Sequence, residues 1–283
     1  MAIQVRGEVL DSRRVGAYTV LSVTAPGIPE AARPGHFVMV GIGGEESSLV
    51  LPRPLAVYQV AERGVYGGSI DLVVGVRGLG TEWLSQRRRG DVIDITGPLG
   101  RPFVLPKEHI SCVLVGEGHR SASLLMLAES LRQRGCRVEV LLGAPNADLL
   151  FGVLEIKRVS SMITVMTEDG STGTRGRVTD VLGDLIAKVD AAVVYAAGPM
   201  STLAEVAEIA RERRSYSQCS VEEAMACGIG ACLSCVVPVI GDDGVTRMLR
   251  ACVEGPVFRG DRVRWSQVGT IPDDVLGAQG ESR

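Results

Sequence analysis

Four cysteines near the C-terminal end of the chain have the spacing of thiolate ligands to an iron–sulfur cluster. They are Cys227, Cys232, Cys235 and Cys252. Four residues separate the first two, two residues separate the next two, and sixteen residues separate the last two. This C-x4-C-x2-C…C spacing is typical of ligands to a 2Fe-2S cluster. Gly228 and Gly230 lie in the first interval, where they permit the left-handed backbone and close approach that a loop around sulfide ions needs.

Other interpretations of the cysteines remain open from the sequence. A structural zinc ion takes thiolates from two short-spaced pairs and needs no glycine-rich loop, and cysteines without any ligand are a further alternative. Disulfides are disfavoured, because seven cysteines leave at least one unpaired and no signal peptide is recognised. Cys112, Cys136 and Cys219 are expected to be small core residues, although Cys219 is close enough in sequence to be confused with a ligand.

The composition excludes several classes of protein. The chain has 283 residues and a net charge of −3, and no basic run interleaved with aromatic residues suggests a nucleic-acid partner. The arginines from Arg87 to Arg89 are expected to form a solvated turn. The longest apolar runs, such as Asp190 to Met200, have about ten residues, which is too short for a membrane span. Met1 to Gly7 lacks the pattern of a signal peptide, so we expect a cytoplasmic protein.

The first hundred residues alternate between apolar and polar side chains, with glycine and proline between the runs. This pattern predicts an antiparallel β-barrel. The expected strands are Gln4 to Ser12, Ala17 to Thr24, His36 to Gly41, Ala56 to Glu62, Ser69 to Val76 and Asp91 to Thr96.

From Ile110 onwards, short apolar strands alternate with helical patterns, which predicts a Rossmann-like parallel sheet. We expect strands at 110–115, 137–143 and 191–197 and helices at 121–134 and 178–186, with the helical pattern ending near Arg211. Pro102 and Pro106 mark a linker after the barrel. The chain is therefore expected to be a multi-domain β plus α/β protein. Its predicted parts are a barrel at 1–103, a nucleotide-type domain at 104–213, a small cysteine-loop domain at 214–262 and a tail at 263–283.

Two short motifs in the first part suit a flavin dinucleotide. Arg53-Pro54-Leu55-Ala56 begins a strand and could place a guanidinium on a diphosphate, with backbone groups along the flavin edge. Gly78-Leu79-Gly80-Thr81 precedes a helix expected at Glu82 to Arg88, whose first amides suit an anion. Taken alone, Arg53 is equally compatible with a surface arginine before a turn, and Gly80-Thr81 with an ordinary helix cap.

Together with the cysteine loop, these motifs resemble a known family over nearly the whole chain, from about Gly7 to Phe258. The motifs that carry the resemblance are Arg53-Pro54-Leu55-Ala56, Gly80-Thr81, Gly97-Pro98-Leu99-Gly100, Thr167-Glu168-Asp169-Gly170-Ser171, Val178-Thr179-Asp180, Ala197-Gly198-Pro199-Met200, Met225 to Cys235, and Cys252-Val253-Glu254-Gly255-Pro256-Val257-Phe258. The chain is similar to the electron-transfer subunit of the dihydroorotate dehydrogenase B type, in the ferredoxin reductase superfamily. The cysteine loop with its trailing Gly-Pro-Val-Phe is the most specific part.

The resemblance implies FAD in the barrel and a 2Fe-2S cluster at the four cysteines. The residues implied to bind FAD are Arg53, Pro54, Leu55, Ala56, Val73, Val74, Gly75, Gly80 and Thr81. No general acid or base is expected, because substrate chemistry belongs to a partner, an FMN-bearing dihydroorotate dehydrogenase catalytic subunit of pyrimidine biosynthesis. The resemblance implies a heterotetramer with two copies of each subunit. Electrons are expected to pass from FMN through the cluster to FAD and then to NAD.

Departures from the family pattern gather at the expected nicotinamide site and leave NAD binding open. The turn reads Gly116-Glu117-Gly118-His119-Arg120 and contains only two of the three glycines of a dinucleotide fingerprint. Glu117 would bring a carboxylate near a pyrophosphate. Ala197 replaces a cysteine that is usual beside the nicotinamide, Ala56 replaces a hydroxyl donor to the flavin, and Gly75 replaces an arginine for which Arg77, two residues on, is the candidate substitute.

An alternative function is therefore an FAD and 2Fe-2S electron-transfer module for another redox partner, such as a hydrogenase or a sulfide- or ferredoxin-linked reductase, with a degenerate nicotinamide site. Relatives of that kind often have aspartate in place of the first cluster cysteine, so Cys227 argues against it. A scaffold without redox function is a third alternative, which a colourless preparation would support.

Overall fold

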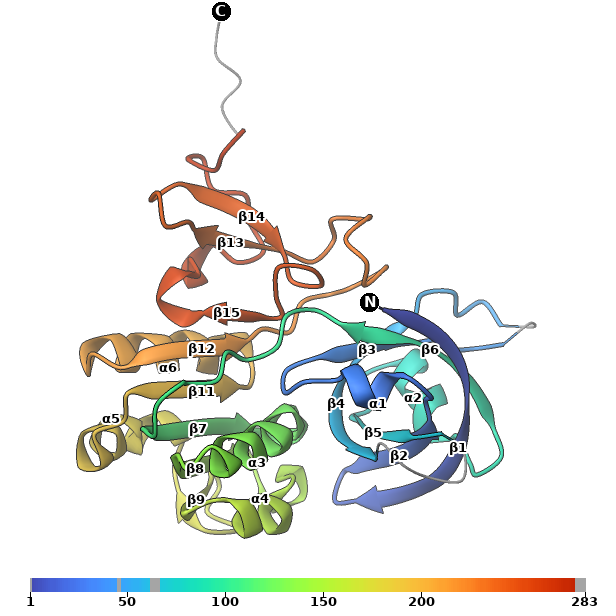
Figure 1. Ribbon diagram of the computed structural model, residues 1–283, viewed down its shortest axis with the longest axis horizontal. Coiled ribbons are helices and arrows are strands. Elements are labelled where there is room, and N and C mark those ends of the chain that lie inside the picture. The colour runs from blue at the N-terminus through green and yellow to red at the C-terminus, as the bar shows by residue number, and fades with distance from the viewer. Residues whose placement is uncertain (1, 45–46, 62–66, 278–283) are drawn as a thin grey trace, which may run out of the picture.

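A computed structural model of the chain describes residues 2–44, 47–61 and 67–277. Figure 1 shows a β-barrel on one side, a sheet flanked by helices on the other, and a smaller unit that holds the cysteine loop next to both. This is the predicted multi-domain β plus α/β fold. The expected strand end at Glu62 and the last residues of the expected tail lie outside the described residues.

The N-terminal part is a closed six-stranded barrel in the order β1-β2-β5-β4-β3-β6. Its strands are β1 (Ile3–Val15), β2 (Tyr18–Thr24), β3 (Phe37–Val40), β4 (Arg53–Ala61), β5 (Ser69–Val74) and β6 (Val92–Leu99). Side chains alternate between the inside and the outside of the closed barrel. Along β6, Ile93 and Ile95 are buried in the barrel interior, whereas Val92 and Asp94 are exposed. Two short helices, α1 (Ile28–Ala31) and α2 (Leu79–Ser85), lie between strands.

The second part is a seven-stranded sheet in the order β10-β9-β8-β7-β11-β12-β15. Its strands are β7 (Ser111–Glu117), β8 (Arg137–Ala144), β9 (Met162–Thr167), β10 (Thr174–Arg175), β11 (Val193–Ala197), β12 (Tyr216–Ser220) and β15 (Val257–Arg259). All neighbours are parallel except β12 and β15. The order reverses between β7 and β11, and in open sheets of this kind ligands bind beyond the carboxyl ends of the strands at such a point.

Helices cover both faces of this sheet (Figure 1). The apolar sides of α5 (Val178–Val189) and α6 (Met200–Glu212) pack on one face, against Val113 and Val194. The other face carries the 3-10 segment η1 (Gly118–Leu124), α3 (Leu125–Gln133) and α4 (Val153–Val159). The resulting doubly wound layer confirms the predicted Rossmann-like arrangement.

The cysteine loop belongs to an excursion between two neighbouring strands of the second sheet. The chain leaves β12, forms the loop and a hairpin of β13 (Val236–Ile240) and β14 (Thr246–Arg250), and returns as β15 beside β12. Further 3-10 turns, η2 (Ala147–Leu149), η3 (Gly260–Arg262) and η4 (Trp265–Gln267), occur along the chain.

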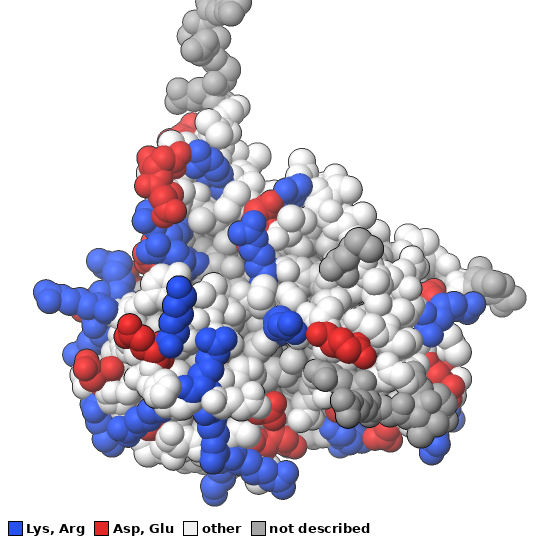
Figure 2. Space-filling view, in the orientation of Figure 1, with Lys and Arg blue, Asp and Glu red and all other residues white. Residues whose placement is uncertain are grey.

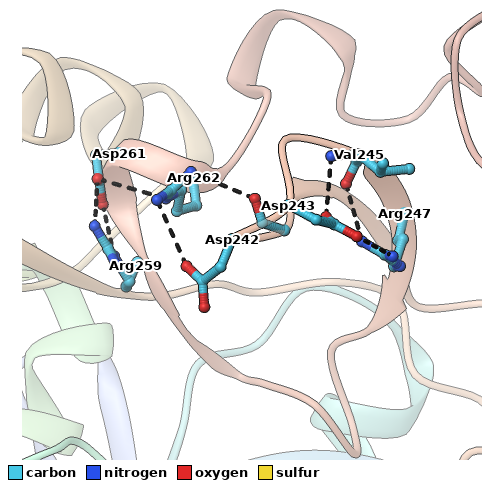
Figure 3. A network of polar contacts seen from close by, with 8 residues as sticks. Asp242, Asp243, Val245, Arg247, Arg259, Asp261 and Arg262 are labelled. Atoms are coloured by element: carbon cyan, nitrogen blue, oxygen red, sulfur yellow. Dashed lines mark hydrogen bonds and ion pairs between the residues drawn. The ribbon is translucent and has the colours of Figure 1, made fainter.

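Ion pairs connect the tip of the hairpin to the returning strand (Figure 3). Arg262 lies 3.5 Å from Asp242 and 3.9 Å from Asp261, and Arg259 pairs with Asp261 at 2.7 Å. A separate pair, Arg247 with Asp243 at 2.6 Å, closes the turn. These side chains are all at least about one-third exposed, so each pair contributes no more than about 1 kcal/mol.

Several elements differ from the sequence expectation. The predicted helix at 121–134 begins as the 3-10 segment η1, and the helix expected at Glu82 to Arg88 instead spans Leu79–Ser85. α4 and β9 were not predicted. Gly75 lies just beyond the end of β5, and the four-part division of the chain into domains stays a prediction. No helix in the described part of the chain is long and apolar enough to cross a membrane.

Candidate cluster and flavin site

The four predicted ligands lie in one loop and the base of one hairpin, where they form two contacting pairs. Cys232 contacts Cys227, and Cys252 contacts Cys235. The second pair is fixed by the hairpin, since the Ala251 N–H donates to the Cys235 carbonyl at 2.8 Å. Cys232 is exposed and Cys227 half-buried, whereas Cys235 and Cys252 are buried. The loop therefore presents one pair toward solvent and the other toward the interior.

The two ends of this set differ in their acid–base behaviour. The pKa of Cys232 is lowered to about 6 by hydrogen bonds from Ser234 first and by contact with Cys227 next. Burial, followed by contact with Cys235, raises the pKa of Cys252 to about 12. The exposed thiol therefore ionises readily, while the buried thiol needs a bound cation to stabilise its anionic form.

The paired geometry suits a two-metal cluster better than one zinc ion. Structural zinc needs four ligands around one point, whereas the four cysteines here form two pairs. In a four-cysteine 2Fe-2S cluster each iron can take two thiolates. The two pairs thus fit such a cluster, and the four cysteines stay the predicted ligands.

The remaining cysteines lie in the core of the second sheet. Cys219 on β12 is fully buried and its Sγ lies 3.9 Å from the Leu203 carbonyl of α6. Burial raises the pKa of its thiol to about 12. Cys112 and Cys136 are buried on the opposite face. The structure therefore places Cys219 within a strand of the sheet and outside the cysteine loop, which sequence spacing alone could not do.

The cysteine loop lies against the barrel. Gly228 has a φ of 71°, and a Cβ at this position would lie 2.3 Å from Cγ of Met39 on β3. Gly230 has a φ of 83° and comparably little space, because a Cβ there would lie 2.7 Å from Val253. Both glycines are therefore required by backbone conformation and by close approach.

A pocket opens beside this loop, between the barrel and the second sheet. Its empty volume is about 730 Å3, a figure that includes open solvent at the mouth. Four of the predicted FAD residues line it, namely Pro54, Leu55, Ala56 and Val73. Its opposite wall includes Ala197 and Met225, the latter two residues before Cys227. The predicted flavin and cluster sites are therefore neighbours.

The other predicted FAD residues lie outside this pocket. A Cβ on Gly80 would lie 2.5 Å from the Arg53 guanidinium, so these two residues are in contact at the start of α2. The Thr81 hydroxyl accepts the Arg77 N–H at 2.8 Å and so shapes the loop before that helix. Val74 is buried in the barrel interior and can offer only backbone groups, and Gly75 lies under the His119 ring. Their contact with FAD stays a prediction.

Sequence reasoning missed several residues of the pocket wall. They are Gly35, Phe37, Ser123, Ser220, Val221 and Glu223. Most belong to segments that carry no dinucleotide motif and are brought together only by the fold. Pro256 also lines the pocket, and its place in the Gly-Pro-Val-Phe motif was the one available signal for this part of the wall.

A second crevice, where the strand order reverses, is occupied by side chains of the unusual turn after β7. The Glu117 carboxylate accepts a hydrogen bond from the Thr202 hydroxyl at 2.7 Å, in the first turn of α6. The His119 ring lies 5.1 Å from the Tyr18 ring, and burial lowers the pKa of this histidine. The imidazole is therefore largely neutral at neutral pH and packs as an apolar group.

An ion-pair bridge joins Arg77 and Arg120, which line this crevice, through Glu222, which lines the first pocket. Arg120 of η1 is hydrogen-bonded to Glu222, and Arg77 of the barrel lies 3.5 Å from that carboxylate. A pyrophosphate entering here would have to compete with Glu222 for both arginines and would face the Glu117 carboxylate. The turn also continues as a 3-10 segment instead of the α-helix that normally presents amides to a pyrophosphate.

Comparisons with known proteins agree with this geometry. The family model described as the iron-sulfur cluster binding domain of dihydroorotate dehydrogenase B matches residues 222–264. The electron transfer subunit of dihydroorotate dehydrogenase B (NAD(+)) of Desulforamulus reducens is 34% identical over 264 residues, covering 91% of this chain and 99% of the relative. A probable subunit of the same kind from Methanopyrus kandleri is 34% identical and covers 95% of both chains.

Solved structures with this fold include flavin-dependent reductases. A chain from the NADH-dependent reduced ferredoxin-NADP oxidoreductase, studied for flavin-based electron bifurcation, has a TM-score of 0.81 and 30% identity, and the match covers 93% of this chain and 91% of that one. The ferredoxin reductase of carbazole 1,9a-dioxygenase, at a TM-score of 0.60 and 17% identity, covers 75% of this chain and 65% of its own and shares the fold alone.

Proposed function

The chain belongs to the family of electron-transfer subunits of dihydroorotate dehydrogenase B, and from this we propose how its residues serve that function. It is an oxidoreductase subunit that carries FAD and a 2Fe-2S cluster and exchanges electrons between a dihydroorotate-oxidising partner and NAD. The observation that carries this proposal is the pairing of the four cysteines directly beside the pocket that Ala56 and Val73 line. When bound, the two cofactors accept and release the electrons. The chain binds the cofactors, holds them at a fixed separation and sets the charge around them.

The four cysteines would hold the cluster through their thiolates. Pro54, Leu55, Ala56 and Val73 hold the flavin ring in the pocket, whereas the guanidinium of Arg53, which lies against Gly80 at the start of α2, binds the FAD diphosphate. Met39 and Met225 lie between the two sites, since Met39 approaches Gly228 and Met225 lines the pocket. Both methionine side chains are buried, so electrons passing between the two sites would cross packed protein.

The partner is an FMN-bearing dihydroorotate dehydrogenase catalytic subunit that docks over the exposed side of the cysteine loop. Ile229 and Leu233 on this loop are 62% and 59% exposed, which is unusual for large apolar side chains. Figure 2 shows that this part of the surface and the adjoining barrel carry few charged side chains. The apolar loop therefore suits a protein interface. We place the complex, with two copies of each subunit, in the cytoplasm and in pyrimidine biosynthesis.

Reconstitution with the catalytic partner tests this function. The chain is purified anaerobically, its iron, sulfide and FAD are quantified, and NAD reduction by dihydroorotate is followed with and without the catalytic subunit. We expect two irons and one FAD per chain, no activity alone, and NADH formation with the partner. Dihydroorotate oxidation by the isolated chain, or a preparation without iron and flavin, contradicts the proposal.

The blocked crevice favours a second candidate function, in which the same chain serves an electron acceptor other than NAD. The Glu117–Thr202 hydrogen bond and the Arg77–Glu222–Arg120 bridge engage the charged side chains of the turn after β7, where a nicotinamide dinucleotide is expected. Titration of the oxidised, FAD-loaded protein with NADH distinguishes the two functions. Bleaching of the flavin band supports NAD, whereas an unchanged spectrum that bleaches with dithionite supports an acceptor such as a redox protein.

A further inference from the structure

Arg250 connects the two halves of the cysteine cage. Its Nη1 donates to the Gly230 carbonyl at 3.2 Å, inside the loop between Cys227 and Cys232. Its backbone belongs to β14, where it pairs with Val236, the residue that follows Cys235. One side chain thus joins the loop that bears the first two cysteines to the hairpin that bears the other two.

The Arg250 guanidinium is held in a fixed position by Glu254. Nε donates to Oε2 of Glu254 at 3.0 Å and Nη2 donates to Oε1 at 2.5 Å, which is a bidentate pair. The same carboxylate also accepts the Arg250 N–H at 2.8 Å. The Arg250 side chain is 35% exposed, so solvent weakens but does not cancel its field.

The positive charge lies close to the buried pair of ligands. Arg250 stands two residues before Cys252, and the Ala251 N–H between them donates to the Cys235 carbonyl. Both thiols are near enough to Arg250 to interact with it electrostatically. No other arginine or lysine in the described chain makes a hydrogen bond to the backbone of the loop between Cys227 and Cys232.

We propose that Arg250 is a positioning residue that also raises the reduction potential of the cluster, and that Glu254 limits this effect. Uptake of one electron, from the flavin of the partner or from dithionite in a titration, adds one negative charge to the cage without breaking a bond. A fixed cation nearby stabilises the reduced form more than the oxidised form, and a fixed anion does the opposite. The inference rests on the proposed function, because it requires a bound cluster.

The test compares the reduction potential of the cluster in four variants by redox titration, followed by electron paramagnetic resonance. In R250Q we expect the equilibrium constant for reduction to fall on the order of tenfold, which is a potential about 59 mV lower for one electron. E254Q leaves the guanidinium uncompensated and is expected to shift the potential upward. R250K keeps the charge and is expected to lie closer to the unmodified protein than R250Q.

R247Q is the matched control, because Arg247 forms the same kind of pair with Asp243 at the other end of β14. It is expected to leave the potential unchanged. Opposite shifts in R250Q and E254Q support the electrostatic role, whereas shifts in the same direction, or none, overturn it. If R250Q loses iron, the upward shift in E254Q becomes the deciding measurement. Absence of iron from the unmodified protein would instead overturn the proposed function itself.

Discussion

Replacement of Gly228 by alanine tests the contact between the cysteine loop and the barrel. The new Cβ would lie 2.3 Å from Cγ of Met39, whereas carbon atoms pack at about 3.5–4.0 Å. The loop and β3 must therefore separate by roughly 1.2 Å or more. The residue must also keep a φ of 71°, which costs a non-glycine residue about 1–2 kcal/mol.

Gly244 provides the control that separates these two effects. Its φ is 79°, similar to that of Gly228, but a Cβ there would meet nothing within 4 Å. Gly244→Ala should therefore cost only the backbone term, about 1–2 kcal/mol. Gly228→Ala should cost a further 1–3 kcal/mol, roughly, for overpacking.

The two variants are compared by urea denaturation followed by circular dichroism, and their iron content is measured after anaerobic purification. We expect Gly228→Ala to be the less stable by roughly 1–3 kcal/mol and to retain less iron. Equal destabilisation by the two alanines would refute the close approach of Gly228 to Met39. It would also show that the cysteine loop does not pack tightly on β3.

Three further changes have expected outcomes of their own. Cys252→Ser should remove the cluster absorbance while FAD remains, whereas Cys219→Ser, the matched change of a core cysteine, should leave the cluster absorbance unchanged. The reverse result would identify Cys219 as the fourth ligand in place of Cys252. Arg53→Ala should weaken FAD binding by about 10- to 100-fold, the equivalent of one charge-assisted hydrogen bond, when measured by flavin fluorescence, and unchanged affinity would make Arg53 a surface residue. Burial lowers the pKa of His36 to about 4, so the unfolded chain binds a proton at this histidine more readily than the folded chain does. The free energy of unfolding should therefore fall as the pH drops from about 6.5 to 4, and acid denaturation of His36→Asn should show a smaller fall over the same range.

The barrel and the parallel sheet were predictable because their burial follows simple periods. β6 alternates strictly between buried and exposed residues because only one of its faces is buried. β7 is a short apolar run because both of its faces are buried. β9 escaped prediction because it lies near the sheet edge, where only Met166 and Thr167 are buried and the pattern is weak. The 3-10 start at Gly118 reflects local hydrogen bonding, since the Ser121 hydroxyl donates to the Gly118 carbonyl at 2.7 Å.

Candidate site residues could be named from the sequence, and they stay predictions, but their arrangement could not be foreseen. Cysteine spacing identified the four candidate ligands because neighbouring thiolates in one loop must reach the same cluster. The unfavourable charge of Glu117 was also apparent from the sequence. Its partner Thr202 is 85 residues away, and the Arg120 partner Glu222 is 102 residues away. Such long-range contacts depend on the fold and leave no local pattern.

The excursion that holds the cysteines is attached to the sheet at both of its ends. It leaves from Ser220 and returns at Val257, which are directly opposite each other in an antiparallel pair. A unit tethered by two adjacent strands cannot swing about a single hinge, so a load applied at the loop by a docking protein is distributed into the edge of the sheet. The closeness of the two ends also makes the unit a self-contained insertion, which a short turn between β12 and β15 could replace without altering the strand order.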